Sequence, residues 1–147
     1  EFDRHTSTIV VDRLRESSMR YPLNYGCIPN TISDDGDPLD IIVICEPIQT
    51  GAVIAARPIG ILMMNDEKGH DVKIIAVPAD RLTTMYLDIQ NVDDIPEMEK
   101  AKIEHFFSHY KDLDNKLGKW SETSGWQGVE VAHDYIRKAI EMGKADK

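Results

Sequence analysis

The stretch that most constrains the fold is an aspartate-rich segment, Asp34–Asp40, which runs directly into the apolar segment Ile41–Ile44. Four of its seven residues are aspartates. Because the β-branched residues that follow are typical of a buried strand, the last aspartates must lie at the rim of a core. Carboxylates held this close repel one another by roughly a few kcal/mol unless a cation lies between them. Gly36 and Pro38 restrict the loop, and rigid oxygen ligands favour Mg²⁺, Mn²⁺ or Ca²⁺ over zinc or copper.

Length and charge narrow the class of protein. With 147 residues, 41% of them apolar, the chain is expected to form one domain over residues 1–147. A formal net charge of −9 argues against a nucleic acid or an anionic membrane as partner, but not against a small polyanion bound through metals. Cys27 and Cys45 form no CxxC motif, which predicts reduced thiols in a cytoplasmic protein. The most apolar stretch, Ala52–Met64, is interrupted by Arg57 and Pro58 and is too short to span a bilayer.

The first half of the chain has the pattern of strands. Strands are expected at Thr8–Arg13, Ile41–Cys45, Val53–Met64 with a bend at Pro58–Gly60, and Val72–Val77. In the first of them, Asp12 and Arg13 should point to opposite faces. A polar turn between the last two should bring Asp66 close to Asp71, which shares a face with Lys73.

From Asp94 onward the hydrophobic period becomes helical. A capping box of Asp94 and Glu97, with Pro96 in the first turn, predicts the start of a helix. The expected segments are a first helix with apolar positions from Ala101 to Leu113, a loop over 115–125, and a second helix over about Val129–Met142 that ends at Gly143. Strands followed by two helices define an α+β domain, and the bends in the strands favour a small closed β-barrel.

Each charged cluster has an ordinary explanation when it is taken alone. The aspartate segment fits a charged turn, and it does not match the spacing of an EF-hand. His105 and His109 lie four residues apart without an HExxH motif, which favours a subunit contact over a zinc site.

The combination of clusters indicates phosphoryl transfer. Carboxylates at Asp35, Asp40, Asp66 and Asp71 are suited to hold two or more divalent ions, and Arg13, Lys73, Lys111 and tyrosine hydroxyls are suited to hold the oxygens of a compact polyphosphate. Metals that neutralise charge and lower the pKa of a water molecule are what this chemistry requires.

Four motifs together resemble the family I soluble inorganic pyrophosphatases of the bacterial type. They are Tyr21–Gly26 (Tyr-Pro-Leu-Asn-Tyr-Gly), Asp34–Asp40, Asp66 with Asp71-Val-Lys73, and His105–Lys111 (His-Phe-Phe-Ser-His-Tyr-Lys). The resemblance implies an OB-like closed β-barrel with two helices packed against it. It also implies Mg²⁺-dependent hydrolysis of inorganic diphosphate to two phosphates by a metal-activated water, with several Mg²⁺ per site and Mn²⁺ as a substitute. The implied assembly is a homohexamer in the cytoplasm.

The same resemblance implies roles for individual residues. The implied metal ligands are Asp35, Asp40, Asp66, Asp71 and Glu1, and the implied phosphate-binding residues are Arg13, Tyr21, Lys73, Tyr110 and Lys111. Asp37 is implied as the general base on the attacking water, with Tyr25 donating a hydrogen bond near it. Asp40 is implied to bridge two ions, so Asp40→Asn is expected to relieve repulsion and leave the metal-free protein at least as stable.

Two other functions remain open at this point. Family members continue upstream of Glu1 with a strand that carries another phosphate-binding lysine and another acidic residue. A chain without that segment is expected to be less active, and the alternative function is a divalent-metal and phosphate-binding module with little turnover. An OB-type nucleic-acid binder is disfavoured by the charge of −9.

Overall fold

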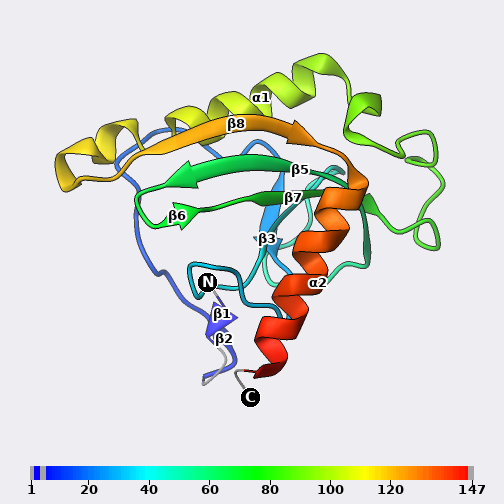
Figure 1. The fold of residues 1–147 in the computed structure, drawn as a ribbon, viewed down its shortest axis with the longest axis horizontal. Coiled ribbons are helices and arrows are strands. Elements are labelled where there is room, and N and C mark those ends of the chain that lie inside the picture. The colour runs from blue at the N-terminus through cyan, green and yellow to red at the C-terminus, as the bar shows by residue number, and fades with distance from the viewer. Residues whose placement is uncertain (1, 4–5, 146–147) are drawn as a thin grey trace.

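The computed structural model describes residues 2–3 and 6–145, which form a mixed sheet and two long helices (Figure 1). The strands are β1 (Phe2–Asp3), β2 (Thr8–Ile9), β3 (Asn24–Cys27), β4 (Asp40–Val43), β5 (Ala56–Asp66), β6 (Gly69–His70), β7 (Lys73–Pro78) and β8 (Ser121–Gln127). The helices are α1 (Glu97–His109) and α2 (Val129–Ala145), with 3-10 turns η1 (Val92–Asp94) and η2 (Asp112–Leu117). The predicted α+β class is therefore observed, with both helices against the sheet.

The main sheet has the strand order β3-β4-β7-β5-β6, and β8 also pairs with β5. All of these pairs are antiparallel except β4 with β7, where Ile41 lies opposite Ile74. The bend expected in β5 is present, because the β5–β7 register shifts between Pro58 and Gly60. Closure into a barrel is not confirmed: across the described strands, pairing ends at β3 on one side and at β6 and β8 on the other.

The core has two parts, one on each face of the sheet. Ile75 and Val77 of β7 pack with Phe106 and Phe107 of α1, whereas Ile74 packs with Ala132 and Ala139 of α2. Alternate residues of β7 thus face opposite helices, as the period of a strand requires. Because both faces are covered, β5 and β7 are almost continuously apolar.

The helix ends differ from those expected. The capping box belongs to η1: the Asn91 side chain accepts a hydrogen bond from the backbone of η1, and the Asp94 side chain accepts one from the Asn91 amide. Pro96 is the N-cap of α1 and makes no side-chain cap. Asp94 and Glu97 have the spacing of a capping box, but the Asp94 side chain accepts from the Asn91 amide and so forms the box with Asn91 instead. Gly143 does not end α2, which continues to Ala145. Gly143 instead serves close packing, because a Cβ there would lie 2.6 Å from the Asn30 carbonyl oxygen.

Two segments were assigned wrongly from the sequence. The predicted loop over 115–125 contains the start of β8, whose polar residues give no strand pattern but which pairs along β5. The predicted strand Thr8–Arg13 ends at Ile9. No helix in the described part of the chain is long and apolar enough to cross a membrane.

Candidate active site

Lys73, the first residue of β7, lies at the centre of the site. Its ammonium group donates to the carboxylates of Asp40 and Asp71, and only 2% of its side chain is exposed. The parallel register of β4 and β7 explains the first contact: Ile41 pairs with Ile74, so the residues that precede them, Asp40 and Lys73, are neighbours. The second contact confirms that Asp71 and Lys73 share a face. Two carboxylates that are far apart in the sequence therefore share one buried cation.

Burial and charge set the protonation of this cluster. Desolvation lowers the pKa of Lys73, but the carboxylates of Asp40 and Asp71 outweigh it and raise the pKa overall, so the ammonium stays charged. Burial raises the pKa of the Asp71 carboxyl to about 6, against the opposing effect of Lys73, and the charges of Asp40 and Asp66 add to the rise. The cluster thus holds more negative charge than one lysine neutralises, which favours binding of a cation.

Lys111, which follows α1, forms a second cluster with the tip of the β5–β6 hairpin. Its Nζ lies 2.7 Å from Asp66 Oδ2 and 2.8 Å from Glu67 Oε2. The Lys68 amide donates to Asp66 Oδ1 at 2.8 Å, and the Trp120 amide donates to Glu67 Oε2 at 3.3 Å. Desolvation lowers the pKa of Lys111, but the hydrogen bonds that its ammonium donates to both carboxylates raise the pKa overall, so this lysine also stays charged.

The aspartate loop is ordered by its own hydrogen bonds. Asp35 Oδ1 accepts from Ser33 Oγ at 2.8 Å and from the Asp37 amide at 3.0 Å. Gly36 adopts a φ of +86°, a conformation that side chains rarely allow. The Asp37 carboxylate projects to solvent, where Lys68 Nζ lies 3.1 Å from it. The hairpin tip and the aspartate loop therefore meet through an ion pair between Lys68 and the predicted base.

Aromatic rings form the floor of the site. Tyr21 stacks on Tyr25 with ring centroids 4.4 Å apart, and Lys73 Nζ lies 5.8 Å from the Tyr25 ring and 5.6 Å from the Phe107 ring. Burial raises the pKa of the Tyr25 phenol, and the charge of Asp40 and a hydrogen bond to it raise it further. Tyr25 therefore keeps its proton beside Asp40.

Tyr110 adds a second phenol beside the lysines. Burial raises its pKa, although Lys73 and Arg15 act in the opposite direction. The Arg15 guanidinium lies 4.6 Å from the centroid of the Tyr110 ring and 3.7 Å from Asp114. Tyr110, Lys73 and Lys111 thus come together as the sequence predicted.

Two predicted residues do not take part in the contacts described above or lie outside the described residues. Arg13 lies after the end of β2, where its Nε is 2.5 Å from Asp12 Oδ2. The expectation that Asp12 and Arg13 face opposite sides is wrong, because the strand ends before them and no pleat separates them. Glu1 lies outside the described residues.

Four charged residues of the site were missed. Glu67 and Lys68 adjoin Asp66 in the tip of a predicted hairpin, and that position was a usable signal. Arg15 and Lys138 lie in segments with no motif, and only the folded chain brings them to Tyr110 and to Asp34.

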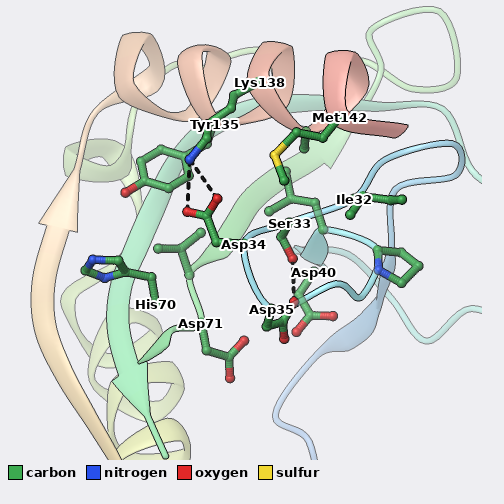
Figure 2. A pocket seen from close by; sticks show the side chains of 14 residues that line it. Ile32, Ser33, Asp34, Asp35, Asp40, His70, Asp71, Tyr135, Lys138 and Met142 are labelled. Carbon is green, nitrogen blue, oxygen red and sulfur yellow. Dashed lines mark hydrogen bonds and ion pairs between the residues drawn. The ribbon is translucent and has the colours of Figure 1, made fainter. Parts of the chain in front are cut away.

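The donor set fits a divalent cation. Among the residues that the structure describes, no three His, Cys, Asp or Glu side chains already form a metal-binding group, because lysines lie between the carboxylates. The carboxylates nevertheless outnumber the lysines, with Asp35, Asp37, Asp40, Asp66, Glu67 and Asp71 against Lys68, Lys73 and Lys111. Figure 2 shows Asp35, Asp40 and Asp71 together at one end of a pocket below α2. Oxygen donors in this number suit a hard cation.

The α+β domain brings carboxylates, buried lysines and phenols together where β4 and β7 begin. This combination defines a metal-dependent phosphoryl-transfer enzyme. Comparison with known proteins identifies the family. The family described as inorganic pyrophosphatase matches residues 1–144, so this chain belongs to the inorganic pyrophosphatase family.

Individual relatives agree with this assignment. The chain is 49% identical to an inorganic pyrophosphatase of Aquifex pyrophilus over 98% of this chain and 81% of that protein, and 48% identical to one of Agrobacterium fabrum over the same shares. A crystal structure of inorganic pyrophosphatase from Thermus thermophilus superposes with a TM-score of 0.91 at 40% identity, covering 98% of this chain and 82% of that one. The predicted family, and with it the prediction of a diphosphate-hydrolysing enzyme, are confirmed. Family membership also implies a divalent metal cofactor.

Proposed function

We propose that this chain hydrolyses inorganic diphosphate to two phosphates with Mg²⁺ as its cofactor, through the residues of the cluster around Lys73 and Lys111. The observation that carries the proposal is that each of these lysines holds two carboxylates at the mouth of one site. An oxygen-lined site with excess negative charge suits Mg²⁺, with Mn²⁺ as a substitute.

The carboxylates are the cation-binding residues. Asp35, Asp40 and Asp71 would hold one Mg²⁺, Asp40 would also reach a second, and Asp66 would join Asp71 on an ion that arrives with the substrate. When bound, a divalent cation neutralises phosphate charge and lowers the pKa of a water molecule. Glu1 is proposed as a further ligand from the family resemblance.

The lysines and phenols are the phosphate-binding residues. Lys73 and Lys111 remain charged in their buried positions, so each is ready to contact a phosphate oxygen once its carboxylates bind cations. Tyr21 and Tyr110 belong to the same aromatic cluster, and their hydroxyl groups would donate hydrogen bonds to the phosphate oxygens. Arg13, which is exposed beside Asp12, is proposed to close on the substrate from the segment after β2.

Asp37 accepts the proton of the attacking water, and Tyr25 positions a neighbouring carboxylate. Asp37 is the carboxylate of the loop with the most exposed side chain, at 66%, where a water molecule has access to it. As water attacks one phosphorus atom, Asp37 takes the proton and the bond from that phosphorus to the bridging oxygen breaks, so that oxygen leaves with the second phosphate. Tyr25 keeps its own proton and holds Asp40 in place. A homohexameric assembly, a cytoplasmic location and a single domain complete the proposal.

The test of this assignment is Asp37→Asn. Loss of a general base lowers kcat by about 10²–10⁴-fold, whereas Mg²⁺ binding measured by calorimetry should stay close to that of the wild type. Asp80→Asn is the matched control, since Asp80 is an exposed aspartate that pairs with Arg57 away from the site. If Asp37→Asn abolishes binding of the first Mg²⁺, Asp37 is a ligand and not the base.

A further inference from the structure

The segment before the aspartate loop is docked directly on α2. The Ile32 amide donates to the Ala139 carbonyl oxygen at 2.9 Å. Close by, the backbone of Asn30 and Thr31 lies against Gly143, where a Cβ would come within 2.6 Å of the Asn30 oxygen. Helix α2 therefore sets where the loop begins.

One side chain of α2 extends this docking into the loop itself. Lys138 Nζ lies 2.7 Å from Asp34 Oδ1 and 2.9 Å from Asp34 Oδ2, so it holds both oxygens of one carboxylate (Figure 2). Asp34 directly precedes Asp35, and Lys138 and Asp35 line the same pocket.

Hydrogen bonds within the loop fix the position of Asp35 relative to Asp34. The Ser33 amide donates to the Asp37 carbonyl at 2.8 Å, the Gly36 amide donates to the Ser33 carbonyl at 3.0 Å, and Ser33 Oγ donates to Asp35. A shift of Asp34 therefore moves Asp35 with it.

We propose that Lys138 is a positioning residue for metal binding: by holding Asp34 against α2 it keeps the Asp35 carboxylate where a divalent cation is bound. The inference rests on the proposed function, because it takes Asp35 as a cation ligand. In this proposal Lys138 acts through Asp34 and not as a ligand of the cation.

For the removal of Lys138, charge alone and loss of positioning predict changes in Mg²⁺ affinity of opposite direction, which makes the inference testable. Removing Lys138 deletes a positive charge near an acidic loop, and charge alone would then tighten the binding of Mg²⁺. Loss of positioning would instead weaken it. The direction of the change in affinity therefore separates the two effects.

The experiment is calorimetric titration of Mg²⁺ into the metal-free protein. Lys138→Ala should raise the Kd by about 2–5-fold, the range expected when an exposed ion pair is lost. The matched control is Arg137→Ala on the same helix, which removes an exposed pair with Asp134 and should leave the Kd unchanged. Both variants should melt within a few degrees of the wild type, because both side chains are exposed.

Two further variants exclude an indirect effect. Lys138→Arg keeps the positive charge and should keep most of the wild-type affinity for Mg²⁺. The double variant Asp34→Lys with Lys138→Asp keeps the net charge and should bind Mg²⁺ more tightly than Asp34→Lys or Lys138→Asp alone. If Lys138→Ala binds Mg²⁺ as tightly as Arg137→Ala, or more tightly, the inference is overturned while the proposed function stands. A wild-type chain that binds no Mg²⁺ overturns both.

Discussion

Lys73 decides the electrostatics of the site at the scale of single residues. With 2% of its side chain exposed, its charge depends on Asp40 and Asp71. The aspartate pattern led to the expectation that Asp40→Asn relieves repulsion in the metal-free protein. The structure instead gives Asp40 an attractive partner, because the buried Lys73 ammonium lies between Asp40 and Asp71.

Asp40→Asn should therefore destabilise the metal-free protein. The change leaves a buried lysine with one carboxylate instead of two, which costs about 1–3 kcal/mol, and the melting temperature should fall by about 2–10 °C. Asp134→Asn, at an exposed pair, is the control and should melt close to the wild type. A melting temperature for Asp40→Asn at or above that of the wild type would restore the original expectation.

Asp71 makes metal binding depend on pH. Burial raises its pKa to about 6, so below that pH the metal-free protein carries a proton on this carboxyl, and a cation must displace it. The affinity for Mg²⁺ should therefore decrease as pH falls through 6, by up to about tenfold per pH unit below it. Calorimetry between about pH 5 and 7 measures this. Asp71→Asn, which has no proton to lose, should show a flatter dependence; an equally steep one would assign the titration elsewhere.

Most of the residues that the structure brings together in the candidate site could be singled out from the sequence, but their contacts could not. The aspartates stand in one short motif next to an apolar run, and the short hairpin brings Asp66 and Asp71 together locally. Pairing of Lys73 with Asp40 depends on the parallel register of β4 and β7, which joins segments far apart in the chain. The contact of Lys138 with Asp34 likewise exists only after α2 docks. Tertiary contacts of this kind leave no local pattern.

At the scale of elements, the bend in β5 was predictable because Pro58 and Gly60 mark it. Helix ends were harder to predict, since two pairs, Asn91 with Asp94 and Asp94 with Glu97, have the spacing of a capping box and only the first is used. Strand β8 could not be predicted because its residues are mostly polar, and in the fold they are only half-buried or exposed. Its position comes from its pairing with β5.

Gly60 shows how closely the elements approach at this bend. A Cβ there would lie 2.1 Å from Val92 Cγ1 and 2.7 Å from the Gln127 carbonyl oxygen. Gly60→Ala should lower the free energy of unfolding by about 1–3 kcal/mol, because η1 or β8 must move. Gly26→Ala is the control in the same sheet, with nothing within 4 Å of the added carbon. Equal chemical denaturation midpoints for the two variants would show that the bend tolerates a side chain.

At the scale of the whole molecule, two helices cover opposite faces of one sheet (Figure 1). The site lies where β4 and β7 begin, at Asp40 and Lys73. Apolar strand segments followed by two segments of helical period predicted this class of fold. Closure of the sheet was not predictable from strand patterns, because it depends on which edges pair.

The exposed histidines of α1 bear on the proposed assembly. His105 and His109 have ring centroids 4.7 Å apart, and Asp112 lies 2.9 Å from His109 Nδ1. If this face lies between subunits, the double variant His105→Asp with His109→Asp places further negative charge beside Asp112 and should break the assembly into smaller particles. Light scattering measures the particle mass. The double variant His105→Asn with His109→Asn, which adds no charge, should keep the mass of the wild type; an unchanged mass for the aspartate variant would place the interface elsewhere.

The most direct test of the proposed function is phosphate release from inorganic diphosphate by the purified chain, with Mg²⁺ and after its removal by a chelator. With Mg²⁺, two phosphates should appear for each diphosphate consumed. Release should fall to the uncatalysed background when the metal is removed and return when Mg²⁺ is restored. If the chain binds Mg²⁺ and diphosphate but releases no phosphate, it is a binding module and the proposed function is contradicted.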